Sequence, residues 1–103
     1  MKPLTFKQLR KANSKRCDTA FDCASWSPLE WGGAMSGEVG ETCNLLKKLK
    51  RDKNIPIKDI AHEIADVVVY ADLLAYKLGI DLGEAIREKF NIVSKRKKCK
   101  ITL

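Results

Sequence analysis

Two pairs of acidic residues have the spacing that places carboxylates on one face of a helix. Glu38 and Glu41 are three positions apart, and Glu63 and Asp66 repeat this spacing, so each pair points to one side of its own helix. If the two helices pack antiparallel across their loop, both pairs lie near mid-helix and can face each other, and four carboxylates in that arrangement repel strongly unless a cation lies between them. All-oxygen ligands select a hard ion. The pairs therefore predict a Mg²⁺ site, which Mn²⁺ could also fill, and such a site favours a phosphate chain as its ligand.

The context of the two pairs favours a built site over a solvated helix face. A single pair of this kind usually lies on a solvated face, but here both pairs lie in apolar sequence on consecutive predicted helices, without a basic residue four positions later in the sequence. His62 precedes Glu63 as in a zinc-protease helix, but the second histidine of that pattern is absent. We interpret His62 as an ordinary surface or interface residue that points away from the acidic pair.

Capping signals define the first half of the chain. Thr5 can cap a first helix that ends near Arg16, and residues 17–28 are expected to form a loop. The sequence Ser27-Pro-Leu-Glu30 has the features of a capping box with proline at the first helical position. It predicts a second helix that reaches about Lys50.

The second half of the chain predicts two more helices. After a turn at residues 51–56, a third helix is expected to end at Gly79, and a fourth to cover residues 81–96. The run Val67–Val69 alone would suggest a strand, but it lies within some twenty residues of helical periodicity. Short connections favour antiparallel neighbours. The predicted fold is all-α, a short antiparallel helix bundle.

The third helix is apolar on almost every side, which predicts an oligomer. A stripe along it has the period of a core face. A second, acidic stripe borders it, and most of the remaining surface is apolar too. The acidic stripe consists of Asp59, Glu63, Asp66 and Tyr70. A chain of 103 residues offers too few neighbours to cover such a helix. We expect a homodimer or homotetramer with the active site near a subunit interface. The predicted core stripe consists of Ile60, Ile64, Val67, Ala71, Leu74 and Leu78.

The composition fits one ordinary globular domain. The 103 residues are 45% hydrophobic and 32% charged, which excludes disordered and collagen-like classes. No apolar run approaches the about 20 residues that cross a bilayer, and the amino-terminal residues lack the hydrophobic core of a signal peptide. We therefore expect a cytoplasmic protein without a membrane partner.

The net charge of +7 is unevenly distributed. Basic clusters at residues 1–16, 47–53 and 95–103 flank two acidic stretches, residues 17–46 and 54–94. A nucleic-acid binder usually spreads positive charge along the element that meets phosphate. Carboxylates in the middle of the chain with lysines at the flanks favour a metal and polyphosphate site instead.

Two other classes of protein stay open as alternatives. One is a small basic helical nucleic-acid-binding protein, in which residues 2–16 and 95–100 contact phosphates. This interpretation explains the basic charge but leaves the acidic pairs without a role. The other is a helical oligomerisation module whose carboxylates bind structural cations.

The four cysteines indicate no metal or redox motif. They are scattered without a C-x-x-C pair, so they predict neither a zinc knuckle nor a redox dithiol. We expect reduced thiols, with a Cys17–Cys23 disulfide as the less favoured alternative in a chain that is not secreted. The other two cysteines are Cys43 and Cys99.

Taken in order, the motifs resemble a known family. They read WGGAMSGEVGETCNLLKK at residues 31–48, EIADVVVY at 63–70, GIDL at 79–82 and KFN at 89–91. Over residues 26–96 the chain is similar to the MazG-like nucleoside triphosphate pyrophosphohydrolases of the all-α NTP pyrophosphatase superfamily. The first motif of that family often reads E-E-x-x-E. Gly37 stands at its leading position here, which leaves the number of bound ions open.

This resemblance implies hydrolysis of an NTP or dNTP to the monophosphate and pyrophosphate, in nucleotide-pool house-cleaning. It implies one domain over residues 1–103, with an N-terminal helix and loop at 1–25, catalytic helices at 26–96 and a basic tail at 97–103. Mg²⁺ would orient the triphosphate and lower the pKa of a bound water. Its ligands would be Glu38, Glu41, Glu63 and Asp66. One of the glutamates would accept the proton of the water, Glu41 in preference to Glu38.

The resemblance also assigns substrate-binding residues. Lys89, together with Asn91 and Arg96, would hold the phosphate tail, and Lys47 or Lys48 could assist; the alternative for each is a solvated surface residue. Tyr70 follows Asp66 by one helical turn and is expected to meet the sugar or the base, unless it packs in the core. A lid from the same or a neighbouring subunit is expected at Trp31 or Trp26.

Overall fold

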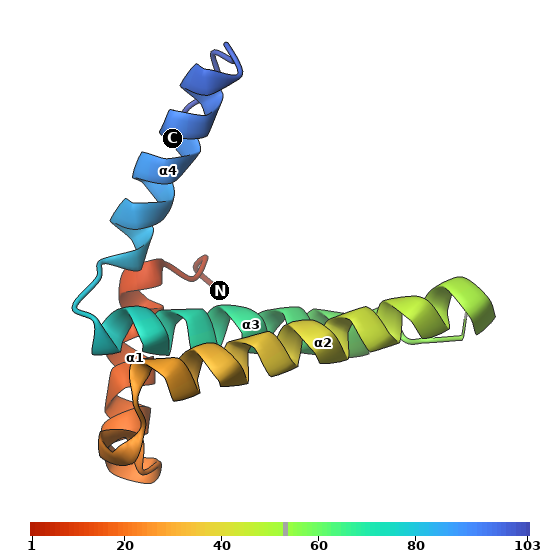
Figure 1. The fold of residues 1–103 in the computed structure, drawn as a ribbon, viewed down its shortest axis with the longest axis horizontal. Helices are drawn as coiled ribbons and strands as arrows, with labels where there is room; N and C mark the ends of the chain where they lie inside the picture. Colours follow the sequence, from red (N-terminus) through yellow and green to blue (C-terminus); the bar gives the residue numbers. More distant parts are fainter. Residues whose placement is uncertain (53) are drawn as a thin grey trace.

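The computed structural model describes residues 1–52 and 54–103, with the backbone alone for Asp52, and this part of the chain is helical without strands. It contains four α-helices and one 3₁₀ turn (Figure 1). The prediction of an all-α chain is confirmed, and residues 67–69 are helical. Lys53, in the predicted turn, lies outside the described residues. The elements are α1 (Phe6–Ala20), η1 (Cys23–Ser25), α2 (Pro28–Asp52), α3 (Ile57–Lys77) and α4 (Leu82–Arg96).

The helices begin where side chains can satisfy their free amides. Thr5 and Gln8 form a capping box, with Gln8 N donating to Thr5 Oγ1 at 3.1 Å. Ser27 and Glu30 exchange the same pair of bonds at the start of α2, at 3.3 and 3.2 Å. Asp81 accepts from the third amide after it and caps α4. These three predicted helix starts are confirmed, because each cap supplies an acceptor for an orphan helix donor.

The end of α3 is a glycine-dependent turn, as the sequence predicts. Gly79 has φ +67°, a conformation that a side chain makes costly. Its amide donates to Tyr76 O at 3.1 Å and the amide of Ile80 donates to Ala75 O at 2.8 Å. This pair of bonds is a Schellman motif, which stops the helix and turns the chain toward α4.

The first helix continues one turn beyond the predicted end at Arg16. It reaches Ala20, so four residues that were expected in a loop are helical. The reason is tertiary: Asn13 and Cys17 lie one turn apart on the face that packs against α3, and both are buried. Packing of this face extends the helix where local capping signals are weak.

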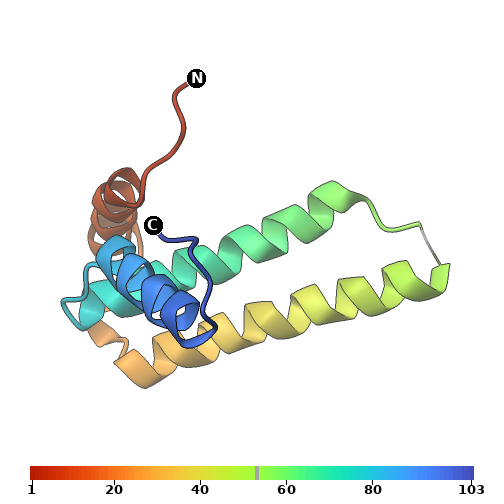
Figure 2. The ribbon, with the colours of Figure 1, turned by 90° about the horizontal axis from the view of Figure 1, so that it is seen from above.

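The helices form an open arrangement. The long antiparallel hairpin of α2 and α3 is crossed at one end by α1, and α4 projects away from it (Figures 1 and 2). Phe6 of α1 and Gly83 of α4 approach each other where the two helices meet. The Cα radius of gyration is 16.1 Å, whereas a compact domain of this length has about 13 Å. Only the hairpin matches the predicted bundle within one chain.

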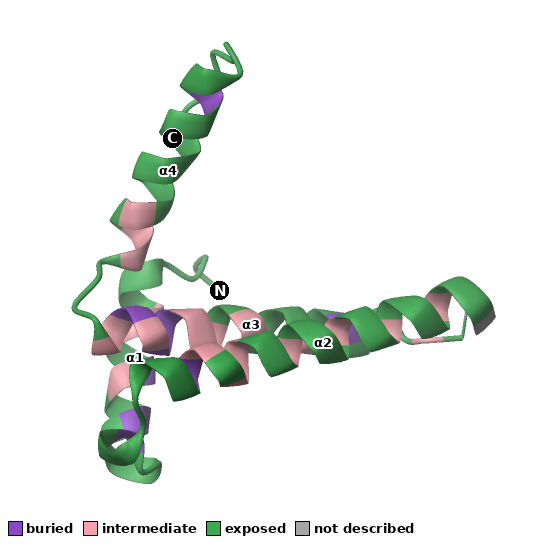
Figure 3. Cartoon of the chain, viewed as in Figure 1, coloured by how far each residue is buried: buried purple, intermediate pink, exposed green. Residues whose placement is uncertain are grey.

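The core lies at the junction of α1, η1, the start of α2 and the end of α3, as the buried residues in Figure 3 show. The predicted core stripe of α3 is buried only in part, since Ile64 is 51% and Leu78 55% exposed. Because α1 crosses the last turns of α3, the buried positions there are Asp72, Leu73 and Ala75 instead. No helix in the described residues has the length and apolarity to cross a membrane.

A buried carboxylate joins α1 to α3. Asp72 is 1% exposed and accepts from Arg10 Nε at 3.0 Å and from Asn13 Nδ2 at 3.1 Å. Asn13 also donates to Val69 O, and Arg10 donates to Ile80 O at 2.9 Å. The charge of Asp72 is thus compensated by the chain itself, as a buried ion requires.

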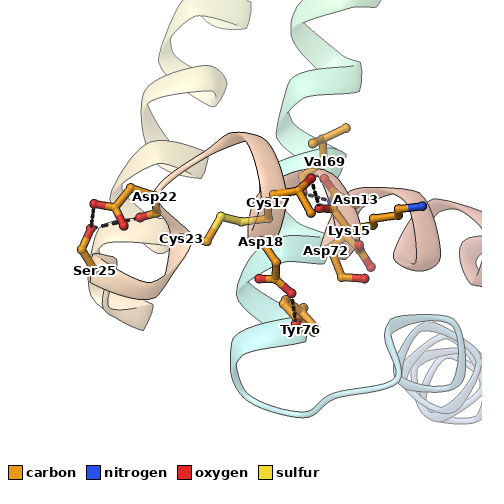
Figure 4. The surroundings of a disulfide bond; sticks show 12 residues. Asn13, Lys15, Cys17, Asp18, Asp22, Cys23, Ser25, Val69, Asp72 and Tyr76 are labelled. Carbon is orange, nitrogen blue, oxygen red and sulfur yellow. Dashed lines mark hydrogen bonds between the residues drawn. A yellow bond between two sulfur atoms is a disulfide. The ribbon is translucent and has the colours of Figure 1, made fainter.

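A disulfide joins Cys17 at the end of α1 to Cys23 in η1, with a Cα–Cα distance of 5.5 Å (Figure 4). The prediction of reduced thiols is wrong for this pair and confirmed for Cys43 and Cys99, which are free and exposed. The pairing depends on the extra turn of α1 and on the 3₁₀ turn that folds Cys23 back. Local sequence signals show neither feature.

Candidate metal centre

The two acidic pairs meet across the hairpin. Glu38 and Glu41 lie on α2 and Glu63 lies on α3, and one carboxylate oxygen from each is within 4.8 Å of the others. We call these three residues the acidic triad. The antiparallel packing of α2 and α3 brings the middles of the two helices together. The predicted approach of the two pairs is confirmed for these three carboxylates.

The triad contains acceptors that the chain does not satisfy. Glu38 and Glu63 are half-buried, and one oxygen of each, Oε2, is buried without a hydrogen-bond partner. A buried acceptor without a donor costs free energy, and more so when it is charged. Glu41 is exposed. The arrangement favours a cation or a proton between Glu38 and Glu63.

The pKa of Glu38 reflects this crowding. The proximity of Glu63, which favours a protonated carboxyl that can hydrogen-bond to it, raises the pKa of Glu38 from 4.5 to about 7, together with partial desolvation and the negative charges of Glu41 and Asp66. The causes are those of a carboxylate pair with no cation between its members. Near neutral pH, a cation and a proton therefore compete for Glu38.

Asp66, the fourth predicted ligand, lies beside the triad and not within it. It is exposed on α3 one turn beyond Glu63, and its charge acts on Glu38. It also lines the same cavity as Glu38. Asp66 therefore borders both the triad and the cavity.

An aromatic cavity of about 580 Å³ opens beside the carboxylates, a volume within the range of small-molecule sites. Glu38 and Asp66 line it together with three aromatic residues that form a tilted ladder. The ring centroids of Trp26 and Trp31 are 4.5 Å apart, and those of Trp31 and Tyr70 are 6.1 Å apart. The cavity combines a negative end with flat apolar walls.

The two tryptophans occupy different depths. Trp31 is 4% exposed and belongs to the core, whereas Trp26 is 38% exposed. Of the two residues expected as a lid, only Trp26 lies where it could cover a ligand. Tyr70 is half-buried and packs against the core while lining the cavity, so both interpretations of Tyr70 describe part of its position.

The structure does not bring the predicted phosphate-binding residues to the triad within one chain. Lys89, Asn91 and Arg96 lie on α4, which points away from the hairpin (Figures 1 and 2). Asn91 holds the C-terminal residue, accepting from Leu103 N at 2.9 Å and donating to Leu103 O at 3.2 Å. Lys89 lines an apolar groove along α4.

The basic side chains outside α4 differ in how close they lie to the cavity. Lys47 and Lys48 are exposed on the far half of α2, beyond Glu41. Arg16 lines the cavity beside the triad, with its guanidinium 5.6 Å from the centre of the Phe21 ring. Arg16 was expected at the end of the first helix and in the basic segment 2–16, and not at this cavity, because the sequence did not indicate that α1 continues through Cys17.

Comparisons with protein-family models, with curated proteins and with solved structures found no match for this chain. The function is therefore inferred from the residues of the site. The site offers carboxylates with unsatisfied oxygens, a cavity with aromatic walls and one cation, Arg16, at that cavity.

Proposed function

We propose that this chain is a Mg²⁺-dependent nucleoside triphosphate pyrophosphohydrolase that converts an NTP or dNTP to the monophosphate and pyrophosphate. The observation that carries the proposal is the meeting of Glu38, Glu41 and Glu63 from two helices beside an aromatic cavity. A triphosphate needs a divalent ion to approach carboxylates, and its base needs flat apolar walls. The motif resemblance to MazG-like enzymes supports the choice of bond.

The donor set fits Mg²⁺. Carboxylate oxygens are the ligands that this ion prefers, and it commonly keeps water or substrate phosphate in its other positions. The buried Oε2 atoms of Glu38 and Glu63 have no donor in the described chain, so an ion between them would satisfy both. Mn²⁺ has the same ligand preference and would substitute.

Each residue of the site has a separate role in the proposed reaction. The bound ion supplies charge neutralisation and a water of lowered pKa. Glu38 and Glu63, with their buried oxygens, would hold the ion. Glu41 is the exposed member of the triad, so its carboxylate is free to accept the proton of the attacking water. Asp66 extends the negative edge of the site, and Tyr70 packs against the sugar or the base.

The proposal includes a second copy of the chain. Lys89 and Arg96 on α4 are needed at the phosphate tail but lie away from the triad of their own chain. The projecting helix also exposes a set of apolar side chains that water alone covers poorly, so a homodimer or homotetramer would place α4 of one protomer at the site of another. The exposed apolar residues of α4 are Ile86, Phe90, Ile92 and Val93. Light scattering should give a mass above the 11.6 kDa of one chain.

The direct test is a panel of NTPs and dNTPs with Mg²⁺, scored separately for pyrophosphate and orthophosphate. Pyrophosphate and a monophosphate are expected from at least one nucleotide, and EDTA should abolish the release. A nucleoside diphosphate with orthophosphate would contradict the assigned bond.

A nucleic-acid-binding protein is the second candidate. The observation that favours it is a basic cluster on an ordered scaffold at the end of α4, where the amides of Lys98 and Cys99 donate to Lys95 O and Ser94 O. This cluster includes Arg96 and Lys97. A salt-sensitive gel shift without nucleotide hydrolysis would support it, but it leaves the acidic triad without a role.

A further inference from the structure

Cys23, one half of the Cys17–Cys23 disulfide, lines the cavity beside the triad. Residues 20–23 and Glu38 all line that cavity. Both cysteines are 1% exposed and belong to the main core cluster. The bond therefore ties the cavity wall to the core, and Figure 4 shows it crossing from the end of α1 to η1.

Apart from the disulfide and the packing of Cys23 in the core cluster, few contacts hold the wall in place, and its hydrogen bonds are local. Among the described residues, the hydrogen bonds of segment 19–25 stay within residues 15–26, for example Phe21 N to Cys17 O and Ser25 Oγ to Asp22 O. We call this segment the wall segment. It carries no hydrogen bond to α2 or α3 in the part of the chain that the structure describes.

Two contacts hold the chain on either side of the wall segment. Before it, Asp18 accepts from the hydroxyl of Tyr76 at 2.8 Å, a bond that raises the pKa of Tyr76. After it, Trp26 packs against Trp31. Between these anchors the disulfide is the covalent link to the core, so the position of the wall depends on that bond.

Reduction would change the packing at this point. Two thiol sulfurs need more room than two bonded ones, and the pair lies in the buried cluster with Trp31 and Leu73. Overpacking a core forces nearby groups to move. The wall segment is the least tethered neighbour, so it would move outward and widen the cavity.

We propose that the Cys17–Cys23 bond is a redox latch on this cavity, closed when oxidised and opened by a dithiol reductant. One thiolate of the reductant attacks a sulfur and breaks the protein disulfide, and its second thiol resolves the mixed disulfide. The chain gains two thiols, and the reductant leaves as a cyclic disulfide after giving up two electrons and two protons. The claim that opening weakens nucleotide binding rests on the proposed function, whereas the change in the cavity does not.

The test uses the full chain with Cys43→Ser and Cys99→Ser, which leaves Cys17 and Cys23 as its only thiols because the chain has 4 cysteines. The 2 tryptophans are Trp26 and Trp31, both at the cavity, so acrylamide quenching of their fluorescence reports on access to the cavity and the core cluster beside it. The Stern–Volmer constant should rise on reduction by dithiothreitol. The KM for a hydrolysed dNTP should rise about tenfold, as expected if the closed wall is then populated about a tenth of the time.

A matched variant separates the bond from the reagent. Cys17→Ser with Cys23→Ser keeps two unbonded side chains close in size to the thiols, so it should behave as the reduced form and should not respond to dithiothreitol. If this variant fails to fold by circular dichroism, the comparison of the two redox forms of the first variant decides alone.

Each outcome is decisive. Equal quenching of the oxidised and reduced forms, or alkylation of both cysteines in denatured protein that was never reduced, overturns the latch. Redox-dependent quenching with no pyrophosphate from either form keeps the latch and removes the proposed function. Redox-dependent quenching with an unchanged KM overturns the control of nucleotide binding.

Discussion

Two carboxylate sites on α3, nine residues apart, differ in what neutralises them. Asp72 is fully buried and is held by Arg10 and Asn13 from α1. Glu63 is half-buried, faces Glu38 and Glu41 from α2, and has a buried oxygen without a donor. The same helix therefore carries one charge that the chain compensates and one that it leaves open.

This difference distinguishes a carboxylate that stabilises the fold from carboxylates that are available to bind a ligand. A compensated buried carboxylate holds helices together, and its loss leaves an unpaired cation. Carboxylates that are brought together without a cation destabilise the fold unless something else binds there. Clustered, uncompensated acceptors beside a cavity are therefore the stronger indication of a ligand site.

The largest expected effect is the loss of turnover in Glu63→Gln. This change keeps the side-chain volume and removes one ligand charge, so pyrophosphate release should fall about a thousandfold, equivalent to about 4 kcal/mol of lost transition-state stabilisation. The melting temperature in EDTA should stay equal or rise, because repulsion by Glu38 and Glu41 is relieved. Normal turnover in this variant would remove Glu63 from the metal centre.

Asp72→Asn is the matched change at the compensated site and should have the opposite profile. Removing its charge leaves Arg10 without a counter-ion and should lower the free energy of unfolding by about 3 kcal/mol. The melting temperature would fall by at least about 10 °C for a domain of this size. Thermal denaturation followed by circular dichroism measures this, with turnover assayed well below the transition. A loss of turnover in folded Asp72→Asn would break the distinction between the two sites.

The sequence was sufficient for the features that depend on local chemistry. Thr5, Ser27 and Asp81 can be recognised as helix caps because a cap acts within three residues. The approach of Glu38 to Glu63 follows from helical spacing and an antiparallel hairpin. The caps and the approach of the two glutamates depend only on elements that are neighbours in the sequence.

The features that depend on how α1 crosses the hairpin could not be predicted. Asp72 resembled any other helical carboxylate until Arg10, 62 positions away, was placed beside it. The Cys17–Cys23 bond needed an extra helical turn that packing stabilises. The projection of α4, which separates Lys89 from the triad, depends on the turn at Gly79. The apolar side chains of α4 are exposed in the single chain, so its own sequence does not determine how they pack.

A smaller effect is expected for Asp66→Asn. Asp66 lies beside the triad and lines the cavity, so it should contribute to binding the metal–nucleotide complex and not be essential to the ion itself. The value of kcat/KM should fall about tenfold, mainly because KM rises. The Mg²⁺ concentration needed for the half-maximal rate should rise as well. A loss as large as that of Glu63→Gln would place Asp66 among the direct ligands.

The smallest effect is the pH dependence of stability without metal, which compares the open site with itself in two protonation states. The pKa of Glu38 is about 7 in the folded chain and 4.5 ordinarily, so between these values the folded state holds a proton that the unfolded state has released. Stability from this group is therefore complete below the lower value and is lost as pH rises through the higher one.

In EDTA the melting temperature should fall modestly from about pH 5 to about pH 7.5, relative to Glu38→Gln, which lacks the titrating group. Mg²⁺ should reduce this fall, because it takes the place of the proton between the carboxylates. If the wild-type chain and Glu38→Gln show the same slope in EDTA, the carboxylates of Glu38 and Glu63 do not share a proton, and the case for an ion between them is correspondingly weaker.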